Sequence, residues 1–145
     1  MFDYDIETRQ IWTSFRHREM RGYEEVAEVT TLAFWRSLVH PDDLPRMLQA
    51  FADLEAGRVD RVDLVARTRH RSGRTLFIRS RAVAERDATG KVTRIIGSSF
   101  DETERIEAEG RLRNAIDSLD SGFAYFDADD RLVICNDGSA ARRTA

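Results

Sequence analysis

The sequence predicts an α+β domain in which short helices cover one face of a five-stranded antiparallel sheet. Near the N-terminus, two short apolar stretches flank a polar turn, which is typical of a β-hairpin. Apolar residues at helical spacing follow, and alternating apolar and polar residues then mark three consecutive strands. We expect a linker helix to leave the last of these strands.

Composition limits the environment and the partners of the chain. Of its 145 residues, 41% are apolar and 34% are charged, which suffices for one modest core. The net charge of −3 does not favour nucleic acid or an anionic membrane as a partner. Cys135 is the single cysteine, so no internal disulfide is expected and a reducing, cytoplasmic environment fits. No membrane contact is expected, because no apolar stretch could span a bilayer and no signal peptide opens the chain.

A hairpin and a broken helical region are predicted at the start of the chain. The hairpin covers residues 2–14. Residues 16–39 are predicted to be helical, but Gly22 and the adjacent Thr30 and Thr31 interrupt them. We therefore expect two or three short helices here instead of one long helix.

A better marked helix is predicted within residues 40–57. Asp43 can cap its N-terminus, Pro45 lies in its first turn and Gly57 follows its end. Its apolar residues recur at helical spacing and form one stripe: Leu44, Met47, Leu48, Phe51 and Leu54.

Three antiparallel strands are predicted next, over residues 61–71, 75–86 and 91–100. Gly73 and Gly90 lie in the two intervening turns, where tight hairpins need a residue with positive φ. The three strands therefore form a meander.

The last strand continues directly into a predicted helix over residues 101–119. Asp101 and Glu104 have the spacing of a capping box, with Asp in place of the usual Ser or Thr. Apolar residues recur along this helix at steps of four and three, as in the seam of a coiled-coil dimer: Ala108, Leu112, Ala115 and Leu119. The pattern lasts for only about two heptads, and Gly110 weakens the helix.

The ordered set of motifs resembles the PAS family of sensory domains, in the variant found in bacterial signalling proteins. The motifs are "DIETRQIWTS", "EMRGYE", a Trp before "HPDD", "RSGRTLFIRSRA", "DATGKVTRIIGSSFDET" and "RIEAEGRLRNAI". They cover residues 2 to about 119 and include an Asp-x-Thr motif at Asp101 and Thr103. The resemblance implies a small pocket between helices and sheet, with a small molecule or only a partner as the signal.

The end of the chain repeats its beginning. Residues 125–136 match residues 3–14 at a constant offset of 122 residues. Together with the resemblance, this repeat predicts a sensor domain over 1–101, a linker helix over 102–121 and an incomplete second PAS domain over 122–145. The last residues of the chain include a Gly-Ser pair that is typical of an added tail.

Eight residues are expected to line the space between helices and sheet: Phe34, Trp35, Met47, Phe51, Leu64, Ile78, Ile96 and Gly97. A completely filled core is the alternative interpretation of the same residues. Gly97 lies in mid-strand, which indicates that a ligand or a helix approaches the sheet closely there. By resemblance, Asp101, Thr103 and Glu104 connect the sheet to the exit helix and transmit the signal.

The identity of any cofactor stays open. Light-sensing members of the family that use flavin carry a cysteine facing the pocket, and the predicted sensor domain has none. Haem-binding members use a histidine on the long helix, whereas His40 precedes this helix. We therefore expect neither covalent flavin photochemistry nor haem. His17 and His70 lack partners at metal-ligand spacing, so both are expected at the surface.

We expect a non-catalytic, cytoplasmic sensor of a bacterial histidine kinase that works as a homodimer. A diguanylate cyclase or phosphodiesterase is the alternative parent protein, and a ligand-free dimerisation module is an alternative function. An enzyme with a site at His40 and Asp42 is a third interpretation. Asp43 as a helix cap explains that motif, and no nucleophile or phosphate-binding motif accompanies it.

Overall fold

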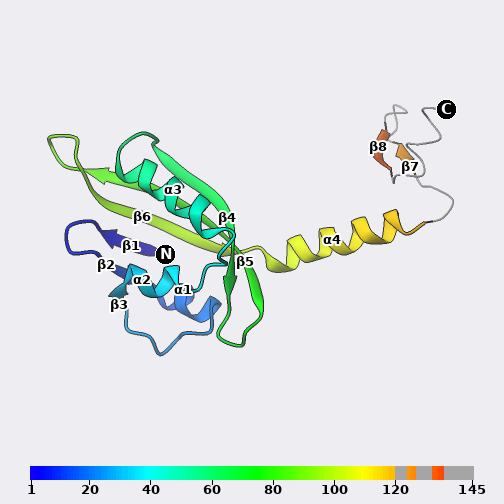
Figure 1. Cartoon of the computed structure of the whole chain (residues 1–145), viewed down its shortest axis with the longest axis horizontal. Helices are drawn as coiled ribbons and strands as arrows, with labels where there is room; N and C mark the ends of the chain where they lie inside the picture. Colours follow the sequence, from blue (N-terminus) through cyan, green and yellow to red (C-terminus); the bar gives the residue numbers. More distant parts are fainter. Residues whose placement is uncertain (120–123, 127–131, 136–145) are drawn as a thin grey trace. The chain divides into compact units, whose positions relative to one another are not determined.

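The computed structural model describes residues 1–119, 124–126 and 132–135. The chain divides into two compact units, Met1–Thr103 and Glu104–Ala145. In the first unit, one antiparallel sheet carries short helices on one of its faces (Figure 1). This arrangement confirms the predicted α+β fold class.

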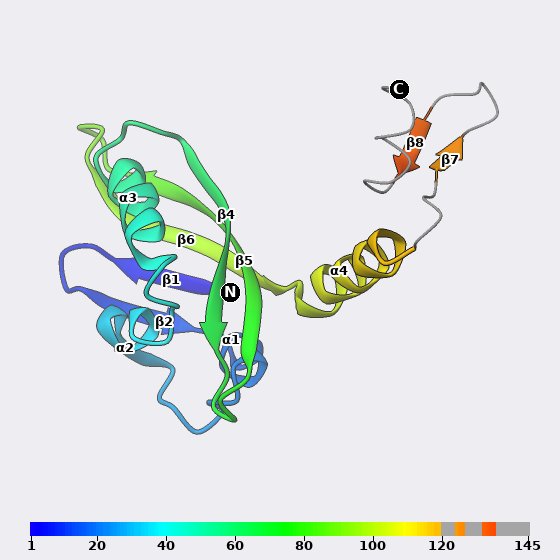
Figure 2. The same ribbon diagram turned by 45° about the vertical axis from the view of Figure 1, so that its right-hand side comes forward.

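The sheet has six described strands in the order β3-β2-β1-β6-β5-β4, and all neighbours are antiparallel. The strands are β1 (Phe2–Asp5), β2 (Gln10–Thr13), β3 (Val29–Thr31), β4 (Arg61–Arg69), β5 (Thr75–Arg86) and β6 (Val92–Asp101). The last strand, β6, lies beside the first, with Phe2 opposite Gly97 (Figure 2). The N-terminal hairpin and the C-terminal meander thereby form one sheet.

Strand β3 is one short strand more than the five expected. The sequence prediction placed its residues inside the broken helical region. Val29 and the threonines after it are β-branched, which favours extended backbone over helix. Val29 pairs with Trp12 of β2, and Glu28 O accepts a hydrogen bond from Thr13 N at 2.8 Å. Residues 29–31 therefore form a strand because they pair with β2, which the folded hairpin provides.

Three helices precede β4: α1 (Phe15–Met20), α2 (Leu32–Arg36) and α3 (Leu44–Glu55). Ser14 caps α1, because its side-chain oxygen accepts a hydrogen bond from His17 N at 3.3 Å. Two short helices followed by a longer one confirm the expected helical organisation.

The predicted capping role of Asp43 is wrong. Asp43 occupies the N-cap position of α3, yet none of the described residues of that helix donates a capping hydrogen bond to its side chain. The carboxylate instead accepts hydrogen bonds from the Arg67 backbone N–H at 2.8 Å and from the Arg67 guanidinium at 2.9 and 3.0 Å. These bonds keep the pKa of Asp43 well below its ordinary value. A bidentate bond between two charged groups is stronger than one capping bond, and it attaches α3 to β4.

The hydrophobic core lies between the helices and the covered face of the sheet. Side chains of alternate strand residues point to this face. The buried core residues come from both layers: Phe2, Tyr4, Ile11, Val62, Ala82, Val92 and Ile95 from the strands, and Trp35, Leu38 and Leu54 from the helical layer.

Helix α4 (Thr103–Asp117) follows β6, as expected for the exit helix. Further along, β7 (Ala124–Phe126) and β8 (Leu132–Cys135) pair antiparallel. Residues 136–145, which include the expected added tail, lie outside the described residues. The predicted division into three segments and the second PAS domain remain predictions.

Candidate functional site

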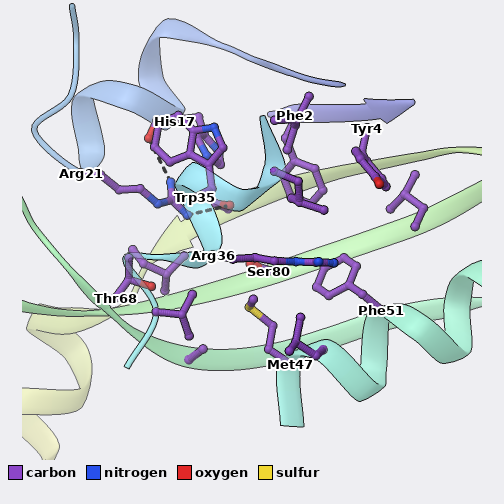
Figure 3. Close-up of a pocket in the computed structure, with 18 of the residues that line it drawn as sticks. Phe2, Tyr4, His17, Arg21, Trp35, Arg36, Met47, Phe51, Thr68 and Ser80 are labelled. Atoms are coloured by element: carbon purple, nitrogen blue, oxygen red, sulfur yellow. Dashed lines mark hydrogen bonds between the residues drawn. The ribbon is translucent and has the colours of Figure 1, made fainter. Parts of the chain in front are cut away.

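A cavity of about 90 Å³ lies between the helices and the covered face of the sheet (Figure 3). Its wall combines side chains from all three N-terminal helices and from every strand of the sheet except β3. The volume corresponds to roughly three water molecules, so only a small molecule fits without rearrangement of the wall. The core is therefore not completely filled.

Four of the eight predicted pocket residues line this cavity: Trp35, Met47, Phe51 and Ile78. Phe34 and Leu64 instead pack, half-buried, against the core. Ile96 and Gly97 line a separate groove that also includes Arg81 and Phe100. A ligand-binding role for any of the eight remains a prediction.

The close approach predicted at Gly97 is made by a neighbouring strand. Gly97 of β6 faces Phe2 of β1. A Cβ at this position would overlap the Phe2 ring and lie 2.5 Å from the Arg81 carbonyl oxygen. Gly97 is thus needed for packing within the sheet.

Two aromatic side chains with polar ring atoms, His17 and Trp35, are buried at the cavity. His17 and Trp35 are 4% and 7% exposed, and their rings meet edge to face with 4.9 Å between centroids. Among the described residues, neither ring nitrogen of His17 has a hydrogen-bond partner, nor does Nε1 of Trp35. Burial, reinforced by nearby positive charges, lowers the pKa of His17 to about 2, so its ring is neutral. The predicted surface position of His17 is wrong, because α1 packs this side chain against Phe2 and Trp35.

Arg21 places a buried guanidinium beside these two rings (Figure 3). Its Nη1 donates a hydrogen bond to the His17 carbonyl oxygen at 3.0 Å, and its Nη2 donates to Ser99 Oγ at 3.3 Å. Its Cζ lies 5.8 Å from the centroid of the Trp35 ring. Burial lowers the pKa of Arg21 to about 10, and the Asp101 carboxylate opposes this shift. The group therefore stays protonated at neutral pH.

The other part of the cavity wall is largely apolar. Met47 and Phe51 of α3 and Ile78 of β5 line it. Arg36, which is half-buried, extends toward Phe51 (Figure 3). Glu55 is the one carboxylate of the lining, and it is exposed. The cavity can thus hold a small molecule with hydrogen-bond acceptors at one end and hydrocarbon at the other.

Sequence reasoning missed the two polar residues that define this site. His17 and Arg21 are four residues apart, a spacing that places two side chains on the same face of a helix. That spacing was the available signal, but it does not tell a buried face from an exposed one.

The predicted signal-transmission residues lie where β6 meets α4. Asp101 Oδ1 accepts a hydrogen bond from Thr103 N at 2.9 Å, and Thr103 Oγ1 in turn accepts one from Phe77 N of β5 at 2.9 Å. The Phe77 carbonyl oxygen accepts a bond from Glu102 N, also at 2.9 Å. Strand β5 therefore holds the start of α4 through the buried Thr103, whereas Glu104 is exposed. Their role in signalling remains a prediction.

The predicted dimer seam is exposed in the single chain. Leu112 and Leu119 are 59% and 45% exposed, and Ala108 and Ala115 are also exposed. Leu119 lies beyond the end of α4 at Asp117. The seam remains a prediction.

The described residues also include His40 and Asp42, the pair considered as a possible enzyme site. No group of three or more His, Cys, Asp and Glu side chains in this part of the chain is placed to hold a metal ion. His40 Nδ1 accepts a hydrogen bond from Asp42 N at 3.1 Å, which is a local turn contact. None of the described helices is long and apolar enough to cross a membrane.

Comparisons with known proteins agree with this architecture. The PAS fold family model matches residues 10–99. A sensory box histidine kinase/response regulator from Burkholderia thailandensis is 31% identical, with a TM-score of 0.68 over 79% of this chain and 84% of that chain. The N-terminal domain of a diguanylate cyclase with a PAS/PAC sensor from Marinobacter aquaeolei is 22% identical, with a TM-score of 0.64 over 72% and 95%. No curated protein sequence matches significantly.

More distant structures share the fold. The PAS-B domain of Drosophila melanogaster Cycle with bound ethylene glycol is 16% identical, with a TM-score of 0.54 over 70% of this chain and 99% of that chain. The family model covers more than half of the chain, and its match includes both the cavity-forming helices and the meander. The chain therefore belongs to the PAS fold family, and its first unit is a PAS sensory domain.

Proposed function

We propose that this PAS domain senses a small molecule in the cavity and transmits binding to an output domain through α4. The observation that carries the proposal is the polar end of the cavity, where His17 and Trp35 keep buried nitrogens without partners among the described residues. A buried polar group without a partner costs free energy, and a ligand that supplies the partner recovers it.

A short path leads from this polar end to the exit helix. Arg21 donates a hydrogen bond to Ser99 of β6, and Asp101 ends the same strand two residues later. Asp101 then binds Thr103, the first residue of α4. A ligand that moves Arg21 would change the end of β6 and favour one arrangement of the strand–helix junction over another.

The parent protein that we propose is a bacterial sensor histidine kinase acting in the cytoplasm. This choice follows the relative at 31% identity, which comes from a sensory box histidine kinase. A diguanylate cyclase or phosphodiesterase is the alternative parent. The proposal assigns no catalytic step to the chain itself.

The test is Asp101→Ala in the full-length parent. We expect the domain to fold and to bind its ligand, because the carboxylate contacts Thr103 and does not line the cavity. The response of kinase autophosphorylation to ligand should be lost. Asp42→Ala, at an exposed turn before α3, is the control and should respond like the wild type. An unchanged response in Asp101→Ala would contradict the proposal.

A second candidate function is a dimerisation module without a ligand. One row of paired residues crosses the uncovered face of the sheet: Val29, Trp12, Asp3, Ile96 and Val83. Val29, Trp12 and Val83 in this row are 50%, 37% and 54% exposed. Exposed apolar side chains that lie together favour contact with another protein surface.

A further inference from the structure

We propose that the ligand of the cavity is a short-chain monocarboxylate, with its carboxylate at Arg21, Trp35 and His17. The inference rests on the proposed function, because it assumes that the cavity admits a ligand. It adds the chemical class of that ligand.

The first argument is the positive charge buried at the cavity. Arg21 is 7% exposed and carries its charge at neutral pH, yet none of the ion pairs in the described part of the chain includes it. Its guanidinium donates instead to the neutral His17 carbonyl and Ser99 hydroxyl. A buried charge is costly unless an opposite charge compensates for it. The Asp101 carboxylate supplies part of that compensation without an ion pair to Arg21 among the described residues, and an anionic ligand supplies the rest.

The second argument is the set of free donors around this charge. Each Arg21 terminal nitrogen carries a second N–H besides the one used toward His17 or Ser99. The indole nitrogen of Trp35 can only donate, and the neutral His17 ring offers one more N–H. The three groups lie close together, with 5.8 Å from Arg21 Cζ to the Trp35 centroid and 4.9 Å between the His17 and Trp35 centroids. A planar carboxylate has two acceptor oxygens that suit a guanidinium and a neighbouring donor.

The third argument is size and polarity. A volume of about 90 Å³ admits roughly three to five non-hydrogen atoms. The wall formed by Met47, Phe51 and Ile78 suits a short hydrocarbon tail, and the volume is too small for a dicarboxylate whose second group could reach Arg36. Among small anions, acetate and propionate combine these properties.

The experiment is a titration of the protein with propionate, followed by the NMR signal of the Trp35 indole N–H. Propionamide is the neutral match of the same shape, and sodium chloride at equal concentration controls for ionic strength. We expect saturable binding of propionate and at least tenfold weaker binding of propionamide and chloride. Binding of propionamide as tight as that of propionate would overturn the inference.

Variants locate the site. Arg21→Gln should weaken propionate binding at least tenfold, and Arg21→Lys should weaken it less because the charge remains. Arg18→Gln is the matched control, since Arg18 is similarly buried but donates to the Thr13 carbonyl and does not line the cavity. Circular dichroism identifies any variant that does not fold. Equal propionate affinity in folded Arg21→Gln and wild type would overturn the inference.

Failure of this inference differs from failure of the proposed function. If neutral molecules such as propionamide or propanol shift the Trp35 signal and carboxylates do not, the cavity binds ligands but the assigned class is wrong. If no small molecule of either kind reaches the cavity, the inference and the sensing function both fail, and dimerisation becomes the better function.

Discussion

Two residues at the cavity, His17 and Trp35, are buried although their rings carry polar nitrogens. His17 lies between Phe2 and Trp35, and its two ring nitrogens lack partners within the described part of the chain. A side chain that is buried in this way stays neutral, because the surroundings cannot solvate the imidazolium ion. The stability of the domain should therefore depend on pH through this one ring.

The prediction for His17 concerns mildly acidic solution. Below pH of about 6.5, the unfolded chain gains a proton at this ring that the folded chain, with a pKa of about 2, does not bind. The free energy of unfolding should thus fall by about 2 kcal/mol between pH 7 and pH 5. His17→Phe should remove this decrease in urea unfolding experiments. His70→Gln, in the turn between β4 and β5, is the control and should keep the decrease. Equal pH dependence of His17→Phe and wild type would show that the His17 ring takes up a proton in the folded state.

Gly97 gives a second prediction at the scale of one residue. In Gly97→Ala the new methyl group meets the Phe2 ring and the Arg81 carbonyl oxygen, and backbone atoms cannot move away cheaply. We expect the free energy of unfolding to fall by about 1–3 kcal/mol in urea denaturation. Gly110→Ala is the control, because no atom lies within 4 Å of the added carbon. A Gly97→Ala variant as stable as the wild type would contradict the tight contact between β1 and β6.

At the scale of elements, side chains at the ends of helices determine how helices attach to the sheet. Asp43 joins the start of α3 to β4 through Arg67, and Thr103 joins the start of α4 to β5 through Phe77 N. Both residues are at the start of a helix, but both accept hydrogen bonds from a strand. Each junction therefore depends on the sheet as well as on its helix.

Thr103 tests this dependence. Thr103→Val keeps the shape of the side chain but leaves the Phe77 N–H without its acceptor, which should cost about 1 kcal/mol of unfolding free energy. Thr103→Ser keeps the hydroxyl and should stay closer to the wild type. Thermal unfolding followed by circular dichroism measures both. If Val is tolerated as well as Ser, the hydroxyl does not hold the junction.

At the scale of the whole molecule, the described residues expose two sets of apolar side chains. One is the row on the uncovered sheet face, and the other is the seam along α4. Leu112 is more exposed than any other large apolar residue that the structure describes. Association of two chains would cover one of these surfaces.

We predict a homodimer that forms through the seam. Leu112→Glu should convert it to a monomer in light scattering after size-exclusion chromatography, because a charge replaces an apolar contact. Arg113→Glu, at the next residue along α4, is the control and should leave the dimer intact. A dimer that withstands Leu112→Glu and is lost in Val83→Glu would instead place the interface on the uncovered sheet face.

The order of the strands and helices could be predicted from the sequence, since these features depend on neighbours along the chain. Alternation in residues 61–100 and the stripe in α3 are such local patterns, and the turn glycines Gly73 and Gly90 both adopt positive φ. The motifs of residues 2–119 also sufficed to identify the family, because they encode the order of the elements. Strand β3 could not be predicted in this way, because it forms by pairing with β2, and α1 lies between the two strands along the chain.

The site was decided by the tertiary structure. Only half of the residues predicted to line a pocket lie at the cavity, because helical and strand periodicity identify the apolar face but not the gaps left in its packing. His17 was expected at the surface and Arg21 carried no prediction, since a polar side chain gives no local sign that a sheet and a second helix will enclose it. Local patterns along the chain were thus enough to predict the family and every element of the first unit except β3. The cavity, its buried charge and the true partner of Asp43 instead arise from contacts between segments far apart in the chain.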